Sequence, residues 1–257
     1  MISNIKSSSP IILSLTNYVV MNFTANVLLA CGFSPIMSLD KSDIEDLSKI
    51  TNGMLINIGT LNDDFIKLCF CGIKNGIKLK IPIVFDPVGS GASRIRTDIS
   101  RQILNIDYDK LVIKGNASEI LSLYQETAGK GVDSVHKSDD IIHIAKEISN
   151  KYNKIICITG RNDYIIQRNK VIKISNGSVK MTKVTGMGCA LGAIIAGFLS
   201  CDFSIDTIVK ALSFYGIAGE IAEEKSNGIG DFAVKFLDAL EKIDDKILTN
   251  RSKIYEI

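Results

Sequence analysis

The sequence predicts an α/β fold with a mainly parallel sheet that helices cover on both faces. Short runs of β-branched and other apolar residues alternate along the chain with longer segments of helical pattern, which is typical of parallel sheets. Four of the apolar runs end directly in a pair of residues with a polar side chain or a glycine. The 257 residues are 46% hydrophobic and include no linker or internal repeat, so we expect one domain over residues 1–257.

The first half of the chain supplies four of the predicted strands. They are expected over residues 11–15, 53–58, 81–85 and 110–113, which are short apolar runs. Helical patterns occupy about 21–31 and 62–78. Another helix is expected to start near Asn116, because Glu119 follows it at the spacing of a capping box.

The second half continues the alternation and then ends in helices. A polar helix is expected around 139–150, a strand over 154–158, and a hairpin from 163–167 and 170–174. Three helices follow, starting near Met187, Ser204 and Asp231. The apolar run over 190–199 is too short to span a membrane, which requires about 20 residues, and indicates a buried helix instead.

Charge and composition argue against several classes of protein. With 30 basic and 28 acidic residues, the formal net charge of +2 gives no support for nucleic acid or a membrane as a partner. The six cysteines include no CxxC pair, and residues 1–10 lack the apolar core of a signal peptide. We therefore expect reduced thiols and a cytoplasmic location.

Several common catalytic motifs are missing from the sequence. It contains no Walker A motif and no GxGxxG fingerprint, so a Rossmann dehydrogenase is disfavoured. The two histidines, His136 and His143, lie in a polar region, which disfavours a site that pairs histidine with cysteine or serine. No cluster of side chains has the spacing of a zinc site.

The glycine-rich turn within residues 184–193 is the strongest indication of a functional site. Gly186 and Gly188 allow a sharp turn with bare N–H groups before a helix, and such a helix N-terminus attracts anions. Cys189 would lie at the mouth of this anion site, where the helix dipole is expected to lower the pKa of its thiol. Alternatively, Cys189 is a structural cysteine of the core.

Polar residues and glycines at the ends of four predicted strands are expected to line one crevice, because ligands of open α/β sheets bind at the carboxyl ends of the strands. These positions are Gly59, Asp86, Lys114 and Thr159. Asp86 precedes a glycine loop and suits Mg²⁺, or it stabilises its own turn. Lys114 would neutralise phosphate charge. Glu119 either supports the metal or only caps its helix.

A block of amide and hydroxyl side chains near the N-terminus has two interpretations. Residues 16–26, TNYVVMNFTAN, interleave three asparagines and two threonines with large apolar residues. The block either caps a helix start at Thr16 or Asn17, or it forms a polar wall for a small uncharged ligand. Met37 would give that ligand a polarisable apolar contact, or it belongs to the core.

Seven blocks, taken together, resemble the hydroxyethylthiazole kinase family of the ribokinase-like group. They are TNYVVMNFTAN at 16–26, SPIMS at 34–38, NIGTL at 57–61, FDPVGSGA at 85–92, KGNASEI at 114–120, ITG at 158–160 and VTGMGCALGA at 184–193. They follow the family's order and span nearly the whole chain. The resemblance implies a three-layer αβα ribokinase-like fold. It also implies transfer of the ATP γ-phosphoryl group to the hydroxyl of 4-methyl-5-(2-hydroxyethyl)thiazole, a step of thiamine salvage.

The resemblance further implies a role for each candidate residue. Cys189 takes the place of the general base, Asp86 and Glu119 organise Mg²⁺, and Lys114, Thr159 and Gly188 contact ATP. The contacts to the thiazole alcohol fall to Met37, Gly186, Asn17 and Gly59. The family is typically a homotrimer with the thiazole site between subunits, so Met37 is expected to serve the site of a neighbouring subunit.

Three positions depart from the family pattern. Leu13 stands where histidine is usual, Lys114 where arginine is common, and Met187 where threonine is common. Lys114 keeps the positive charge but lacks the bidentate fork of a guanidinium. Met187 lacks a hydroxyl that would contact phosphate.

Two other functions stay open. One is a kinase of the same fold for another small ring alcohol, of the hydroxymethylpyrimidine or pyridoxal type. The cysteine at the place of an aspartate and the block at 16–26 argue against it. The other is a non-catalytic nucleotide-binding protein of this fold, which the presence of Asp86, Glu119 and Cys189 disfavours.

Overall fold

One mixed sheet runs through the computed structural model, which describes residues 1–124 and 138–257. Its nine strands in this part of the chain lie in the order β2-β1-β3-β4-β5-β6-β7-β8-β9. They are β1 (Ile11–Leu15), β2 (Ser34–Ile36), β3 (Gly53–Asn57), β4 (Ile83–Asp86), β5 (Leu111–Asn116), β6 (Ile155–Thr159), β7 (Asp163–Gln167), β8 (Lys170–Ile174) and β9 (Ile254–Glu256). β1 to β6 pair in parallel, and β7 to β9 extend the sheet with antiparallel pairs.

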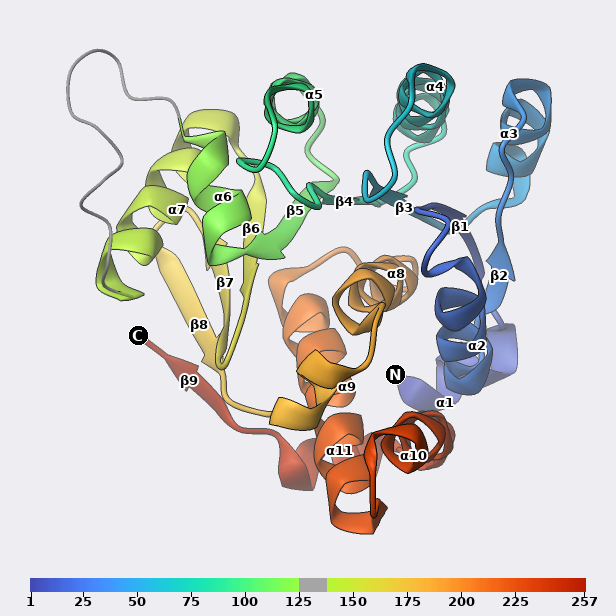
Figure 1. Cartoon of the computed structure of the whole chain (residues 1–257), viewed down its shortest axis with the longest axis vertical. Coiled ribbons are helices and arrows are strands. Elements are labelled where there is room, and N and C mark those ends of the chain that lie inside the picture. The colour runs from blue at the N-terminus through green and yellow to red at the C-terminus, as the bar shows by residue number, and fades with distance from the viewer. Residues whose placement is uncertain (125–137) are drawn as a thin grey trace.

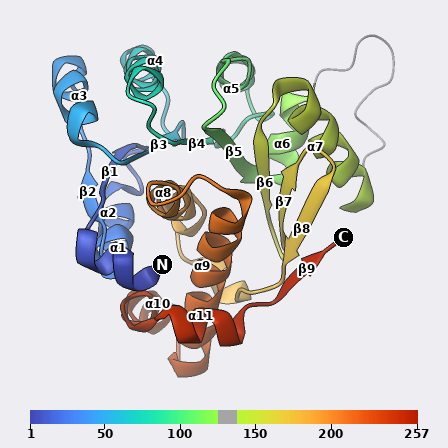
Figure 2. The ribbon, with the colours of Figure 1, turned by 180° about the vertical axis from the view of Figure 1, so that it is seen from behind.

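Helices cover both faces of the sheet (Figure 1), and the view from behind shows the same two layers (Figure 2). One layer holds α3 (Lys41–Leu47), α4 (Asp63–Lys78), α5 (Arg94–Leu104), α6 (Ala117–Leu123) and α7 (Ser138–Tyr152). The other holds α1 (Ile2–Ser8), α2 (Met21–Cys31), α8 (Met187–Leu199), α9 (Ile205–Lys225), α10 (Ile229–Lys242) and α11 (Asp245–Arg251). The predicted three-layer αβα architecture is confirmed.

Alternate side chains of the central strands enter two separate apolar cores. In β3, Leu55 packs with the layer of α8, whereas Met54 and Ile56 pack with the layer of α4. Successive side chains of a strand point to opposite faces of the sheet. Both faces are buried here, which explains why these strands are continuous apolar runs in the sequence.

α8 lies close to the sheet because glycines remove side chains from the contact. A Cβ atom on Gly53 of β3 would overlap the carbonyl oxygen of Ala196 in α8. A Cβ atom on Gly192 would lie 2.8 Å from Leu55 Cδ1 and 3.9 Å from Asp86 Oδ2. The helix is therefore held against β3 and the carboxyl end of β4.

The predicted elements are present, with small differences in their bounds. β1, α2, β7 and β8 have the predicted bounds. β4 begins after Pro82, which has no N–H for the ladder. β5 continues past Ile113 to Asn116 because Asn116 pairs with Thr159 of the neighbouring strand.

Among the α-helices and strands of the described residues, six were not predicted, namely α1, β2, α3, α5, α11 and β9. β2 and β9 have three residues each and are too short for a periodic pattern. His136 lies outside the described residues. Among the helices that are described, none has the length and apolar content needed to cross a bilayer.

Candidate functional site

A buried ion pair joins two strand ends to the first turn of α8. Lys114 Nζ lies 3.0 Å from Asp86 Oδ2 and donates to the carbonyl oxygen of Gly188 at 2.8 Å. The side chains of Lys114 and Asp86 are 4% and 1% exposed. The predicted convergence of β4, β5 and the glycine-rich turn is therefore confirmed.

The first turn of α8 is fixed from two sides. Gly186 begins it with a φ of 90°, and a Cβ atom there would lie 3.1 Å from Val20 Cγ1. Lys114 binds the Gly188 carbonyl, and the buried hydroxyl of Tyr215 donates to the Met187 carbonyl at 2.8 Å. The first N–H groups of a helix have no intrahelical acceptor, so this turn can receive an anion.

Asn57 connects the acidic end of the site to its thiol end. Its Nδ2 donates to Asp86 Oδ2 at 2.9 Å, and its Oδ1 accepts from Asn17 Nδ2 at 2.8 Å and from Gly59 N at 3.0 Å. Asn17 Nδ2 lies 3.6 Å from Cys189 Sγ. Asn57 lies within the predicted apolar strand over 53–58, and an amide inside such a run is itself a sign of a buried polar contact.

Gly59 allows the close approach of Asn17. A Cβ atom at position 59 would lie 2.5 Å from Asn17 Nδ2, a distance that real Cβ contacts do not reach. The glycine is thus needed for the packing of this loop beside Asn17 and Cys189.

The expected lowering of the Cys189 pKa is wrong. Burial of the thiol and the charge of Asp86 raise its pKa above the ordinary value, and Lys114, Asn57 and Asn17 only partly oppose them. The helix dipole acts at the exposed mouth of a helix, whereas this thiol lies half-buried beside a carboxylate. Most of the thiol is protonated at neutral pH.

The centre of the site carries an excess of negative charge. Burial raises the pKa of Asp86 to about 6, and the charge of Glu119 adds to the effect despite Lys114. For Lys114, burial lowers the pKa, but Asp86, Cys189 and Glu119 together raise it above the ordinary value. A divalent cation would neutralise this excess negative charge.

Asp86 has a free acceptor for a cation. Among the described residues its Oδ1 atom is buried and has no hydrogen-bond partner, and a carboxylate oxygen is a ligand that Mg²⁺ prefers. Metal sites of this kind use one or two carboxylates together with water and substrate phosphates. The residues at this position therefore fit Mg²⁺.

Glu119 has the predicted helix-capping geometry. Its Oε2 accepts from Asn116 N at 2.8 Å, and Asn116 accepts from Glu119 N, which completes a capping box at the start of α6. Its Oε1 accepts from Gly89 N at 3.0 Å and so reaches the loop that follows Asp86. Glu119 thus lies within electrostatic reach of Asp86 while its carboxylate oxygens are held by main-chain groups.

A cavity of about 720 Å³ opens beside the glycine-rich turn. Thr159, Met187, Gly188 and Tyr215 are among the residues that line it, together with apolar side chains of the 3₁₀ turn Val179–Lys183. Thr159 Oγ1 donates to the Gly115 carbonyl at 3.4 Å. The cavity has room for a nucleotide-sized ligand.

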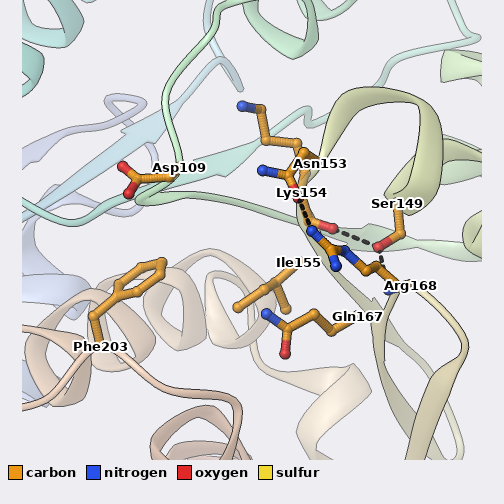
Figure 3. Close-up of a pocket in the computed structure, with 8 residues that line it drawn as sticks. All are labelled: Asp109, Ser149, Asn153, Lys154, Ile155, Gln167, Arg168 and Phe203. Atoms are coloured by element: carbon orange, nitrogen blue, oxygen red, sulfur yellow. Dashed lines mark hydrogen bonds between the residues drawn. The ribbon is translucent and has the colours of Figure 1, made fainter.

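A smaller hollow, whose lining residues are drawn in Figure 3, has a volume of about 200 Å³ and lies at the amino ends of the central strands β5 and β6. It is lined by residues that precede β5 and β6, such as Asp109 and Asn153, and by the turn at Arg168. The Lys154 ammonium donates to the Tyr108 carbonyl at 2.7 Å, and the Arg168 guanidinium to Asn153. These hydrogen bonds join neighbouring segments of the chain, and the hollow lies away from the carboxyl ends of the strands, at which open α/β sheets bind ligands.

The match to a protein family covers almost the whole chain. Residues 2–246 match the model of the hydroxyethylthiazole kinase family. The chain belongs to the hydroxyethylthiazole kinase family. A hydroxyethylthiazole kinase of Staphylococcus saprophyticus is 43% identical over 261 residues, which cover 100% of this chain and 98% of that protein.

Solved structures agree with the family and the fold. The structure of a hydroxyethylthiazole kinase protein from Pyrococcus horikoshii superposes with a TM-score of 0.89 at 30% identity and covers 100% of this chain and 97% of that one. A ribokinase-like superfamily protein of Enterococcus faecalis has a TM-score of 0.67 at 14% identity, covering 92% and 88% of the two chains, and supports the fold alone.

The structure shows the surroundings of Leu13 and Met187, two positions that depart from the hydroxyethylthiazole kinase pattern, and of the candidate residue Met37. Leu13 is fully buried in β1 among apolar residues and takes no part in the contacts of the site. The Tyr215 hydroxyl donates to the Met187 carbonyl oxygen at 2.8 Å and lies 3.6 Å from Met187 Sδ. Met37 follows β2, is half-buried, and is not part of the hydrogen-bonded cluster of Asn17, Asn57, Asp86 and Cys189 among the described residues.

Proposed function

We propose that this chain transfers the γ-phosphoryl group of ATP to the hydroxyl of 4-methyl-5-(2-hydroxyethyl)thiazole, in thiamine biosynthesis. One observation carries the proposal: hydrogen bonds and close contacts link Asp86, Lys114, Asn17 and Cys189 around the first turn of α8. Asn57 connects Asp86 to Asn17 within this cluster. Phosphoryl transfer requires positioning and charge neutralisation more than covalent help, and this cluster supplies both.

The nucleotide would occupy the large cavity beside the turn. Thr159 and Gly188 line it, and the Lys114 ammonium lies against the Gly188 carbonyl at the boundary between this cavity and Asp86. The N–H groups of the turn and the helix dipole would stabilise the γ-phosphate as its charge develops. Thr159, Lys114 and Gly188 are therefore our candidate ATP contacts.

Asp86 and Glu119 would hold Mg²⁺, Asp86 through its unpartnered Oδ1. When bound, Mg²⁺ neutralises phosphate charge and orients the transferred group. The excess negative charge around Asp86 supports this assignment.

The alcohol would lie on the opposite side of the turn, beside Asn17, Gly59 and Gly186. Cys189 is our candidate for the proton acceptor, because its Sγ lies between the turn and the Asn17 amide. Only the thiolate can accept the proton, so the raised pKa of Cys189 restricts this role to the ionised fraction of the molecules.

We also propose a homotrimer in which Met37 contacts the thiazole ring in the site of a neighbouring subunit. Tyr18, Val19 and Leu39 follow the neighbouring strands β1 and β2 and are 56%, 67% and 49% exposed. Exposed large apolar side chains after two neighbouring strands support a contact between subunits there.

The test is ADP release by purified protein with MgATP and a panel of ring alcohols. Hydroxyethylthiazole is expected to give the highest kcat/KM, with hydroxymethylpyrimidine and pyridoxal as comparison alcohols. Turnover of hydroxymethylpyrimidine or pyridoxal without turnover of the thiazole would replace the proposal with a kinase of another ring alcohol. ATP binding without turnover of any alcohol would indicate a nucleotide-binding protein.

A further inference from the structure

Arg96, in the first turn of α5, binds three main-chain carbonyl oxygens. Its Nη1 atom donates to Ile58 at 2.6 Å and to Val88 at 2.8 Å, and its Nη2 atom donates to Gly59 at 2.8 Å. Nη1 has two N–H groups, and both are used. Neither α5 nor a role for Arg96 was predicted from the sequence.

The three carbonyls belong to two different loops of the site. Ile58 and Gly59 follow β3, and Gly59 is bonded to Asn57 on the side of the acceptor alcohol. Val88 follows β4, two residues after Asp86 in the loop that also binds Glu119 through Gly89. One planar cation on a helix outside both loops thus connects the alcohol side of the site to the carboxylate side.

The path of the Arg96 side chain requires a glycine. Gly89 has a φ of 73°, and a Cβ atom there would lie 3.1 Å from Arg96 Cδ. Gly89 therefore gives the side chain room to reach the carbonyls while its own N–H binds Glu119. Arginine commonly binds phosphate directly, but the two Nη1 donors here are already bonded to carbonyls.

We propose that Arg96 is a positioning residue, which sets the spacing between the loop at Gly59 and the loop at Asp86. The proposal rests on the proposed phosphoryl transfer, because it concerns the distance between the alcohol and the metal-binding carboxylate. Displacement of reacting groups by about 1 Å can lower a rate by about 10²-fold. Lysine cannot replace this arginine, since one ammonium lacks the planar fork that reaches three acceptors.

The experiment compares Arg96→Ala and Arg96→Lys with Arg94→Ala. Arg94 is in the same helical turn, is 95% exposed and, among the described residues, pairs with Asp98 at 3.5 Å and with no loop carbonyl. Its variant therefore removes the same charge without a loop contact. We expect kcat/KM for hydroxyethylthiazole to fall about 10–100-fold in both Arg96 variants and to be unchanged in Arg94→Ala. The KM for MgATP is expected to change by less than about twofold.

Guanidinium ion at millimolar concentration is expected to restore part of the activity of Arg96→Ala, because the deleted group leaves room for it. It should not activate Arg96→Lys, whose side chain still fills the space. Rescue at an unchanged melting temperature separates positioning from a loss of folding.

Three results would overturn the proposal. They are wild-type kinetics in Arg96→Ala, a rise confined to the KM for MgATP, which would indicate a phosphate ligand, or a loss that guanidinium does not restore. If the wild-type protein itself does not turn over hydroxyethylthiazole, the proposed function fails instead, so the two failures are distinct.

Discussion

Cys189 has a well-placed thiol with an unfavourable pKa. Burial and the Asp86 carboxylate raise this pKa above its ordinary value, so the thiolate is a minor species at neutral pH. Because each pH unit below a pKa reduces the ionised fraction about tenfold, a reaction that requires the thiolate becomes faster as the pH rises.

We therefore expect kcat of the wild-type protein to rise about tenfold per pH unit between about pH 6 and pH 8, under conditions where chemistry limits the rate. Cys189→Asp carries a carboxylate with an ordinary pKa of about 4 and should retain much of the turnover at neutral pH with a flatter profile. Cys189→Ala should lose most of it. Equal slopes in the wild type and Cys189→Asp, or full activity of Cys189→Ala, would reject the base assignment.

Asn57 offers a second prediction at the residue scale. Asn57→Asp keeps the shape of the side chain but replaces the donor to Asp86 Oδ2, at 2.9 Å, with a second carboxylate. A hydrogen bond to a charged group contributes about 1.5–3 kcal/mol, so we expect kcat to fall about 10–100-fold.

The matched control for Asn57 is Asn52→Asp, at the other end of β3. Asn52 Oδ1 accepts from Ile11 N at 2.8 Å, and an aspartate preserves this acceptor. Steady-state kinetics of both variants, with melting temperatures, check the prediction. Equal rates in the two variants would show that Asn57 has no part in the reaction.

The candidate residues differ in how far the sequence could predict them. Asp86, Lys114 and Cys189 each stand at a strand end or a glycine turn, where local pattern and function coincide, and their close grouping is confirmed. Asn57 and Arg96 act through contacts with residues distant in the sequence. The amide of Asn57 inside an apolar run indicates a buried polar contact but not its partners, and an arginine among the other charged residues of α5 is not unusual. The pKa of Cys189 depends on burial and a neighbouring carboxylate, which no local pattern contains.

At the scale of the elements, the contact of α8 with β3 depends on Gly53. Gly53→Ala would bring a Cβ atom against the main-chain carbonyl of Ala196, and main chain cannot move aside as a flexible side chain does. We expect a destabilisation of about 1–3 kcal/mol, as for other overpacked cores, measured by urea unfolding.

Gly230→Ala in α10 is the control for Gly53→Ala. A Cβ atom at Gly230 meets no described atom within 4 Å, and alanine in a helix is more favourable than glycine by about 0.5–1 kcal/mol. The two variants should therefore change stability in opposite directions. A stable Gly53→Ala protein with unchanged kinetics would show that α8 can shift without consequence.

Element prediction succeeded where a strand or helix has a complete apolar pattern. The central strands β3 to β6 and the long helix α4 have such patterns, and all were predicted. α5 was missed because its buried residues Ile99, Ile103 and Leu104 stand among charged ones. β9 pairs with β8 near the end of the chain, a pairing that depends on tertiary structure rather than on its three residues.

At the scale of the whole molecule, the exposed apolar side chains of Tyr18, Val19 and Leu39 after β1 and β2 favour assembly of this chain into an oligomer. Val19 is 67% exposed beside Tyr18, so Val19→Asp should place a charge in the proposed subunit contact. If the wild-type protein is the proposed trimer, we expect this variant to sediment as a smaller species and to lose thiazole turnover.

Val234 in α10 is the matched control, since it is 58% exposed and lies on another helix. Val234→Asp should leave both sedimentation and turnover unchanged. A monomeric wild-type protein with full activity would refute the trimer and the role of Met37 across subunits.

The bond between Lys114 and Gly188 has a consequence for how this sequence can diverge. A Cβ atom at Gly188 would lie 3.8 Å from Lys114 Nζ, in ordinary van der Waals contact. A side chain longer than alanine at position 188 would therefore compete for space with the side chain at position 114. We expect the order of substitutions to matter. An arginine can enter position 114 while Gly188 is still present, but a bulky residue fixed first at position 188 would close that route. The neighbourhood of α8 would then evolve along ordered steps rather than by independent changes.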